Sequence, residues 1–171
     1  METALAQKTD MAEQCQFLTF TVGDSEYGVA IMSVREIRGW TDATRLPNRP
    51  PYMRGVINLR GSIIPIFDLR CRFMGDLTTA HPKNVIVILS VEEKLIGLLV
   101  DAVSDIVTVT PHDIKEAPQQ DDIAIDNRFI DGLLSVHDRM VIILNSAQLL
   151  RADLTVADAT EPTTPANTNL S

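Results

Sequence analysis

The sequence predicts an all-β protein built from two SH3-like, five-stranded β-barrel subdomains that pack together, with short helical turns and flexible tails. Short apolar runs with period-two alternation are separated by turn residues along most of the chain. The pattern also occurs twice, and each copy of about 60–70 residues is too small for a sandwich but suits a small barrel. Val, Ile and Leu dominate a chain with 5% aromatic residues, so we expect an aliphatic core.

The first expected elements form a hairpin near the N-terminus. QFLTFTV at 16–22 alternates apolar and Thr residues, and YGVAI at 27–31 returns after the turn-like sequence GDSE. The pattern changes in MSVREIRG at 32–39, where Val34 and Ile37 have the three-residue spacing of a helix face. We therefore expect a short helical segment after this hairpin.

An irregular, proline-containing connection at 40–51 leads to a second hairpin. GVINL and SIIPIFD are its strands, with Arg60-Gly61 at the turn. Pro65 cannot donate a hydrogen bond to a neighbouring strand, which favours an edge strand or a bulge at this position. LRCRFMG at 69–75 is typical of a short helical turn.

A second set of strands follows. NVIVILS at 84–90 and LIGLLV at 95–100 form a hairpin around VEEK, and DAVSDIVTVT continues from there. Residues 111–128 are polar and acidic. Another hairpin covers 129–145, and Ser146 is a candidate N-cap for a terminal helical turn.

The two sets align with each other without gaps. YGVAIMSVREI at 27–37 lies over IGLLVDAVSDI at 96–106, and RGVINLRGSIIPIFDL at 54–69 lies over DGLLSVHDRMVIILNS at 131–146. Chance similarity between β-hairpins is the alternative explanation. Two ungapped matches favour a duplicated unit instead.

The duplication and the composition define the expected domain boundaries. We expect a flexible N-terminal tail at 1–15, a folded body at 16–151, and a disordered tail at 152–171 that is rich in Thr, Ala, Asn and Pro. Within the body, the first barrel covers about 16–75 and the second about 84–151. The repeat leaves open an exchange of strands between the two barrels.

Charge is distributed unevenly along the chain. The net charge of −8 argues against nucleic acid as a partner. Residues 35–72 nevertheless hold eight arginines against three acidic residues, a net charge of +5, while the rest of the chain carries −13. Such an arginine-rich region suits recognition of carboxylates on a partner protein. The alternative is that these arginines are solvated on different faces.

Other features limit the location and chemistry of the protein. No apolar run approaches the roughly 20 residues needed to span a bilayer, so we expect no direct membrane insertion. The N-terminus has no secretion signal, which predicts a cytoplasmic protein with Cys15 and Cys71 as free thiols. The histidines lack partners at metal-ligand spacing, and no nucleotide-binding or nucleophile motif is present. We therefore expect no enzyme activity, no cofactor and no metal.

Four segments carry a resemblance to a known family. EYGVAIMSVREIRGW, YMRGVINLRGSIIPIFDLR, LIGLLVDAVSDI and DGLLSVHDRMVIILN closely resemble the CheW coupling proteins of bacterial chemotaxis. The resemblance implies a non-enzymatic adaptor of two SH3-like subdomains that couples chemoreceptor tips to the regulatory domain of the histidine kinase CheA, in membrane-associated arrays. The alternatives are a coupling module of a related two-component route, such as pilus motility or surface sensing, and a small-ligand-binding barrel.

The resemblance also implies binding residues. Five positions match family positions implicated in receptor binding or in shaping the receptor groove: Val34, Glu36, Gly55, Arg60 and Gly97. For the kinase, the resemblance directs attention to the 38–51 connection and the 115–130 loop, with candidate residues Arg38, Trp40, Arg45 and Gln120. Because the second copy has no equivalent of Arg60, we expect Arg60 to face a partner or brace the junction, and Arg54 and Arg70 to be ordinary surface charges.

Overall fold

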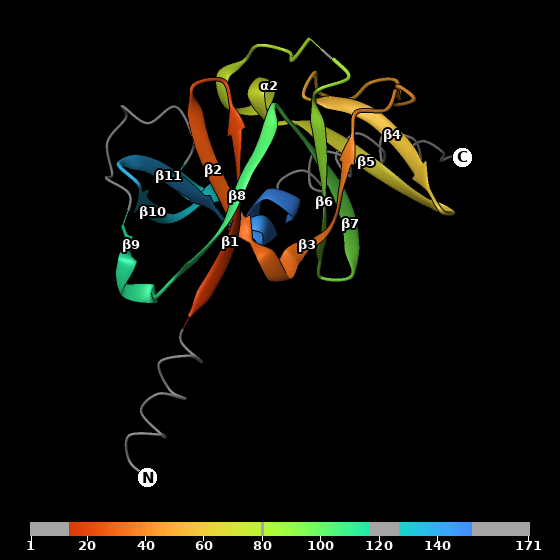
Figure 1. Ribbon diagram of the computed structural model, residues 1–171. Coiled ribbons are helices and arrows are strands. Elements are labelled where there is room, and N and C mark those ends of the chain that lie inside the picture. The colour runs from red at the N-terminus through yellow and green to blue at the C-terminus, as the bar shows by residue number, and fades with distance from the viewer. Residues whose placement is uncertain (1–13, 80, 117–126, 152–171) are drawn as a thin grey trace, which may run out of the picture.

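The computed structural model describes residues 14–79, 81–116 and 127–151, and they form two β-sheets (Figure 1). The first sheet has the order β8-β1-β2-β11-β10-β9, with bounds Ala102–Val109, Cys15–Val22, Ser25–Ala30, Arg139–Leu144, Ile130–Val136 and Ile114–Lys115. The second sheet has the order β3-β6-β7-β5-β4, with bounds Val34–Gly39, Val85–Val91, Lys94–Val100, Ser62–Asp68 and Met53–Leu59. The helical elements are η1 (Ile31–Ser33), α2 (Leu69–Met74), η2 (Pro111–Asp113), η3 (Asn127–Phe129) and a last turn at 146–151.

The fold class agrees with the sequence prediction, but the strands are shared between the two sequence repeats. The β1–β2 hairpin of the first repeat joins β8 to β11 of the second, and the β6–β7 hairpin of the second repeat joins β3 to β5 of the first. The segments 16–75 and 84–151 are therefore repeats of sequence and not separate sheets. The first sheet also gains the two-residue strand β9, which the sequence pattern did not indicate.

Two equivalent parallel contacts join the exchanged hairpins to their host sheets. In the second sheet β5 runs parallel to β7, with Ile66 opposite Gly97, and in the first sheet β11 runs parallel to β2, with Ile143 opposite Gly28. These two pairs occupy equivalent positions in the repeats. Each glycine leaves room for the isoleucine, whose Cδ1 atom would lie 2.5 Å from a Cβ at Gly97 and 3.1 Å from one at Gly28.

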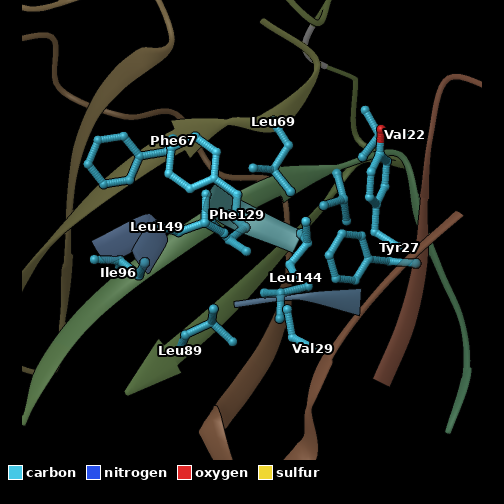
Figure 2. Packing of buried hydrophobic residues seen from close by; sticks show 14 of the residues in the cluster. Val22, Tyr27, Val29, Phe67, Leu69, Leu89, Ile96, Phe129, Leu144 and Leu149 are labelled. Carbon is cyan, nitrogen blue, oxygen red and sulfur yellow. The ribbon is translucent and has the colours of Figure 1, made fainter. Parts of the chain in front are cut away.

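The largest apolar cluster lies between the sheets. Tyr27 and Val29 of β2, Phe67 of β5 and Leu89 of β6 point into it together with residues from the chain's last turn (Figure 2). Each sheet also has a smaller apolar cluster. The cluster of the second sheet consists of Ile57, Leu59, Ile64, Ile66, Ile86, Ile88 and Leu99. The cluster of the first sheet consists of Phe17, Leu134, Val141 and Ile143. Small barrels have thin cores, so burial between the two sheets supplies much of the apolar stabilisation.

Two local predictions are wrong. Residues 32–39 are not helical beyond Ser33, because 34–39 pair with β6 and alternate between half-buried and exposed side chains. Val34 is half-buried and Ile37 is exposed, so their three-residue spacing does not mark one buried face of a helix. Strand β5 is internal, and Pro65 is tolerated because the pairing with β7 begins one residue later, at Ile66.

The tails at 1–15 and 152–171 lie outside the described residues, except for residues 14 and 15, and Cys15 begins β1. The last helical turn is capped by Asn145 rather than by Ser146, since Asn145 Oδ1 accepts a 2.9 Å hydrogen bond from the Gln148 amide. Asp68 caps α2 in the same way at the equivalent position of the first repeat.

Replacing Gly55 by Ala should destabilise the fold by about 2–4 kcal/mol, because two penalties act together. Gly55 has a φ of 140°, and a Cβ there would overlap the backbone carbonyl group of Thr44. Gly61 has a φ of 90° with open space around it, and Gly39 has neither constraint. Denaturant unfolding should therefore rank the Ala variants at 55, 61 and 39 from most to least destabilised; equal losses would contradict this account.

Candidate functional site

Three of the five predicted receptor-binding residues lie on one row across the second sheet. The register pairs Glu36 with Ile88, Ile88 with Gly97, Gly97 with Ile66, and Ile66 with Gly55. Directly paired residues share a face of the sheet, so this row runs along one face from edge to edge. Strand pairing alone thus aligns Glu36 with Gly97, which lies 61 positions further along the chain.

Arg60 joins this row at its Glu36 end. Its Nη2 lies 2.5 Å from Glu36 Oε1, and the Arg60 side chain is 71% exposed against 27% for Glu36. Strands β3 and β4 are the two edges of the second sheet, and Arg60 begins the turn after β4. The ion pair therefore connects opposite edges of the sheet and leaves the guanidinium accessible to a partner.

The two glycines have an internal role. Gly97 is buried opposite Ile66, and Gly55 sits at a register shift where the Thr44 backbone pairs with Val56 in both directions, at 2.8 and 2.9 Å. Gly132, the repeat counterpart of Gly55, also allows a neighbouring backbone to approach closely, because a Cβ there would lie 2.8 Å from the Lys115 carbonyl oxygen. Gly55 and Gly97 therefore act by letting neighbouring groups approach the backbone of the row that ends at Glu36. Val34, the remaining member, is half-buried at the start of β3 and packs against the central core.

The predicted kinase-binding residues do not form one cluster. Trp40 and Arg45 line the same open pocket of about 610 Å³, together with Arg49, Arg54, Met53 and Leu77. Arg38 instead lies near Glu36, with its Nη1 3.5 Å from Glu36 Oε2. Gln120 lies outside the described residues. The pocket combines three arginines and apolar groups with one carboxylate, that of Asp42, and its cationic excess suits an acidic partner segment that also carries an apolar side chain.

The expectation that Arg54 is an ordinary surface charge is wrong. Its Nη1 lies 3.0 Å from Asp68 Oδ2, where the Asp68 side chain is fully buried and that of Arg54 is 21% exposed. Asp68 also accepts hydrogen bonds from the Thr78 amide and hydroxyl, both at 2.7 Å, and from the Cys71 amide. Arg54 thus neutralises a buried carboxylate that holds β5, α2 and the segment at Thr78 together.

The same expectation for Arg70 is also wrong. Arg70 Nη2 lies 2.9 Å from Asp101 Oδ2, which accepts a second hydrogen bond, at 2.8 Å, from the Gly23 amide. Asp101 lies between β7 of the second sheet and β8 of the first, and Gly23 lies in the β1–β2 turn. Arg70 therefore braces the junction between the two sheets.

The sequence reasoning missed several exposed apolar residues. Met32 is 91% exposed, Ile63 is 63% exposed and Ile106 is 52% exposed. Ile63 stands beside the buried Ile64, so an apolar run that looked like a fully buried strand has an exposed side chain at its start. Alternation within SIIPIFD was the available signal, because Ile64 and Ile66 point to the face opposite Ile63.

The described residues contain no group of three or more His, Cys, Asp or Glu side chains that could hold a metal ion. The thiol of Cys71 is not activated: burial, followed by the Asp68 charge, raises its pKa. Within the described ranges, no helix has the length and apolar character required to cross a membrane. The features that distinguish this surface are instead an edge ion pair, an arginine-lined pocket and exposed apolar side chains.

Two packed β subdomains with such surface features define a protein-interaction domain. The sequence profile described as "CheW-like domain" matches residues 16–154. The chain is 45% identical over 131 residues to the chemotaxis protein CheW of Rhizobium meliloti, covering 75% of this chain and 83% of the relative. It is 36% identical over 138 residues to CheW of Klebsiella aerogenes, covering 81% and 82% respectively.

A solved structure agrees with these relatives. The crystal structure of the scaffolding protein TtCheW from Thermoanaerobacter tengcongensis superposes with a TM-score of 0.70 at 30% identity, covering 77% of this chain and 84% of that one. The chain belongs to the CheW-like domain family. It is an adaptor of bacterial chemotaxis, and its family is one of scaffold proteins.

Changing Asp68 to Asn should destabilise the protein by about 3 kcal/mol, since it leaves the Arg54 charge without its buried partner. Changing Glu36 to Gln should cost less than about 1 kcal/mol, since its partner Arg60 is largely exposed. Both substitutions convert a carboxylate to an amide beside an arginine, so they form a matched pair. Chemical denaturation measures both, and a larger loss for Glu36→Gln would contradict the assignment of these roles.

Proposed function

We propose that this chain couples the cytoplasmic tips of methyl-accepting chemotaxis receptors to the regulatory domain of the histidine kinase CheA. The observation that carries the proposal is the alignment of Glu36, Gly97 and Gly55 on one row, with Arg60 bonded to its end. The five residues were selected from sequence resemblance alone. Four of them belong to one connected arrangement, which supports a common function.

The receptor site is centred on Glu36 and Arg60. Both side chains retain exposed surface, whereas Gly55 and Gly97 act through close packing within the sheet. A receptor segment can accept hydrogen bonds from the Arg60 guanidinium, which offers five donors and uses one nitrogen for Glu36. Val34 adds apolar contact at the start of the same strand.

The kinase site is centred on Trp40 and Arg45 in the arginine-lined pocket. The second kinase contact lies in the 115–130 loop, of which residues 115–116 and 127–130 are described. Two contacts at separate places allow one adaptor to touch two kinase domains, which supports recruitment into membrane-associated receptor arrays. The adaptor transmits a change in contact free energy between its partners, and its own covalent structure is unchanged.

Replacing Arg60 by Ala, or Glu36 by Ala, should lower receptor-dependent kinase activation roughly tenfold, because a central charged contact is lost. The measurement is kinase activity in a reconstituted assay with receptor fragment and kinase. Arg35→Ala is the matched control, since Arg35 is an exposed arginine on the same strand as Glu36. If both variants are folded and activate the kinase like the wild type, the receptor-site assignment fails.

Reversing the charge of Arg45 with Glu should weaken binding of the kinase regulatory domain about tenfold and leave receptor binding unchanged. Affinity measured at two salt concentrations tests the electrostatic origin, because wild-type binding should weaken as salt increases. Arg35→Glu introduces the same charge change outside the pocket. Equal losses for the two charge reversals would argue against a kinase site at Arg45.

A further inference from the structure

The short helix α2 lies where the two sheets meet, at the top of the view in Figure 1. Phe73 packs on Tyr27 of β2 with ring centroids 5.5 Å apart, and Arg70 reaches Asp101 at the junction. A Cβ at Gly23 would lie 3.5 Å from Met74 Sδ. This helix of the first repeat therefore contacts elements of both sheets.

Arg72 occupies a special position on this helix. Its guanidinium carbon lies 4.3 Å from the Tyr52 ring centroid and 5.0 Å from the Phe129 ring centroid. Tyr52 precedes β4 of the second sheet, and Phe129 precedes β10 of the first. A cation over an aromatic face is attracted by the ring quadrupole, so Arg72 is held to both rings at once.

Tyr52 and Phe129 are equivalent residues of the two repeats. The carbonyl of Tyr52 accepts a 2.6 Å hydrogen bond from the Asp68 amide, and the carbonyl of Phe129 accepts a 2.8 Å bond from the Asn145 amide. The repeat alignment places Asp68 over Asn145 as well. Each aromatic residue is thus anchored in the same way at the start of its closing hairpin.

The symmetry ends at Arg72. Its counterpart in the second repeat is Leu149, which is fully buried in the central core. The first repeat therefore has a cation where the second has an aliphatic side chain. Nothing in the duplication itself requires a charged residue between the two aromatic rings.

The two rings also end the segments assigned to kinase contact. Tyr52 follows the 38–51 connection directly, and Phe129 closes the 115–130 loop. We propose that Arg72 is a positioning residue that holds the described ends of these two segments, at Tyr52 and at Phe129, in a fixed relative arrangement by binding both rings. Its functional consequence rests on the function proposed above: two kinase domains are bridged efficiently only when both contacts are preorganised.

Arg72→Met tests this role because it keeps the length and apolar stem but removes the cation. The readout is the distance distribution between spin labels at Thr44→Cys and Lys115→Cys, in full-length protein with Cys15 and Cys71 changed to Ser. The distribution should broaden in Arg72→Met and recover in Arg72→Lys. Arg128→Met is the control, because Arg128 lies 5.1 Å from the Phe129 centroid within its own segment. An unchanged distribution in a folded Arg72→Met variant overturns the proposal.

A second measurement tests the consequence for binding. Bridging of two kinase regulatory domains by Arg72→Met should fall about tenfold while the affinity for one domain stays within about twofold of wild type, because only the effective concentration of the second contact changes. Equal losses in both affinities would indicate a direct contact and would overturn the positioning role. Absence of kinase binding by the wild type would instead count against the proposed function, and the label distances would still decide the role of Arg72.

Discussion

The parallel pairing of β5 with β7 and of β11 with β2 is the constraint on which the rest of the structure depends. Parallel neighbours cannot be joined by a tight hairpin, so each pair must bring together strands from distant parts of the chain. Here each pair joins a hairpin of one repeat to the closing strands of the other. Both contacts require a glycine opposite an isoleucine, Gly97 with Ile66 and Gly28 with Ile143. The exchange makes neither repeat complete without the other.

Polar anchors complete this exchange at equivalent places. Asp68 and Asn145 both cap a short helix at the end of a closing strand, and each pairs with the first residue of the aligned hairpin, Arg54 or Asp131. The first repeat uses a cation with a carboxylate, and the second uses a carboxylate with an amide at 2.9 Å. The geometry is retained while the chemistry differs. The buried carboxylate of Asp68 is tolerated because Arg54, Thr78 and the Cys71 amide supply its hydrogen-bond partners.

The arginines of the first repeat have divided roles. Arg54 and Arg70 stabilise the interior and the junction, Arg72 spans two aromatic rings, and Arg60 keeps an exposed guanidinium beside Glu36. An adaptor needs rigid placement of its contact surfaces more than it needs any single strong contact. The arginine-rich region supplies both rigid placement and contact groups, because some of its arginines brace the fold and others lie on the surface.

Local pattern determined most of the strands, the hairpin turns and the duplication, and the resemblance to a known family selected the residues on the second sheet. Alternation and turn residues act within a few positions, so they are readable from the chain. The tertiary structure decided which hairpin joined which sheet, that residues 34–39 form a strand, and that Arg54 and Arg70 are braces. Residues 34–39 pair with β6 despite their helical spacing, and Arg54 forms an ion pair with the buried carboxylate of Asp68, 14 positions away. Both contacts depend on how separate segments pack against each other, and a periodic pattern within one segment cannot predict that packing.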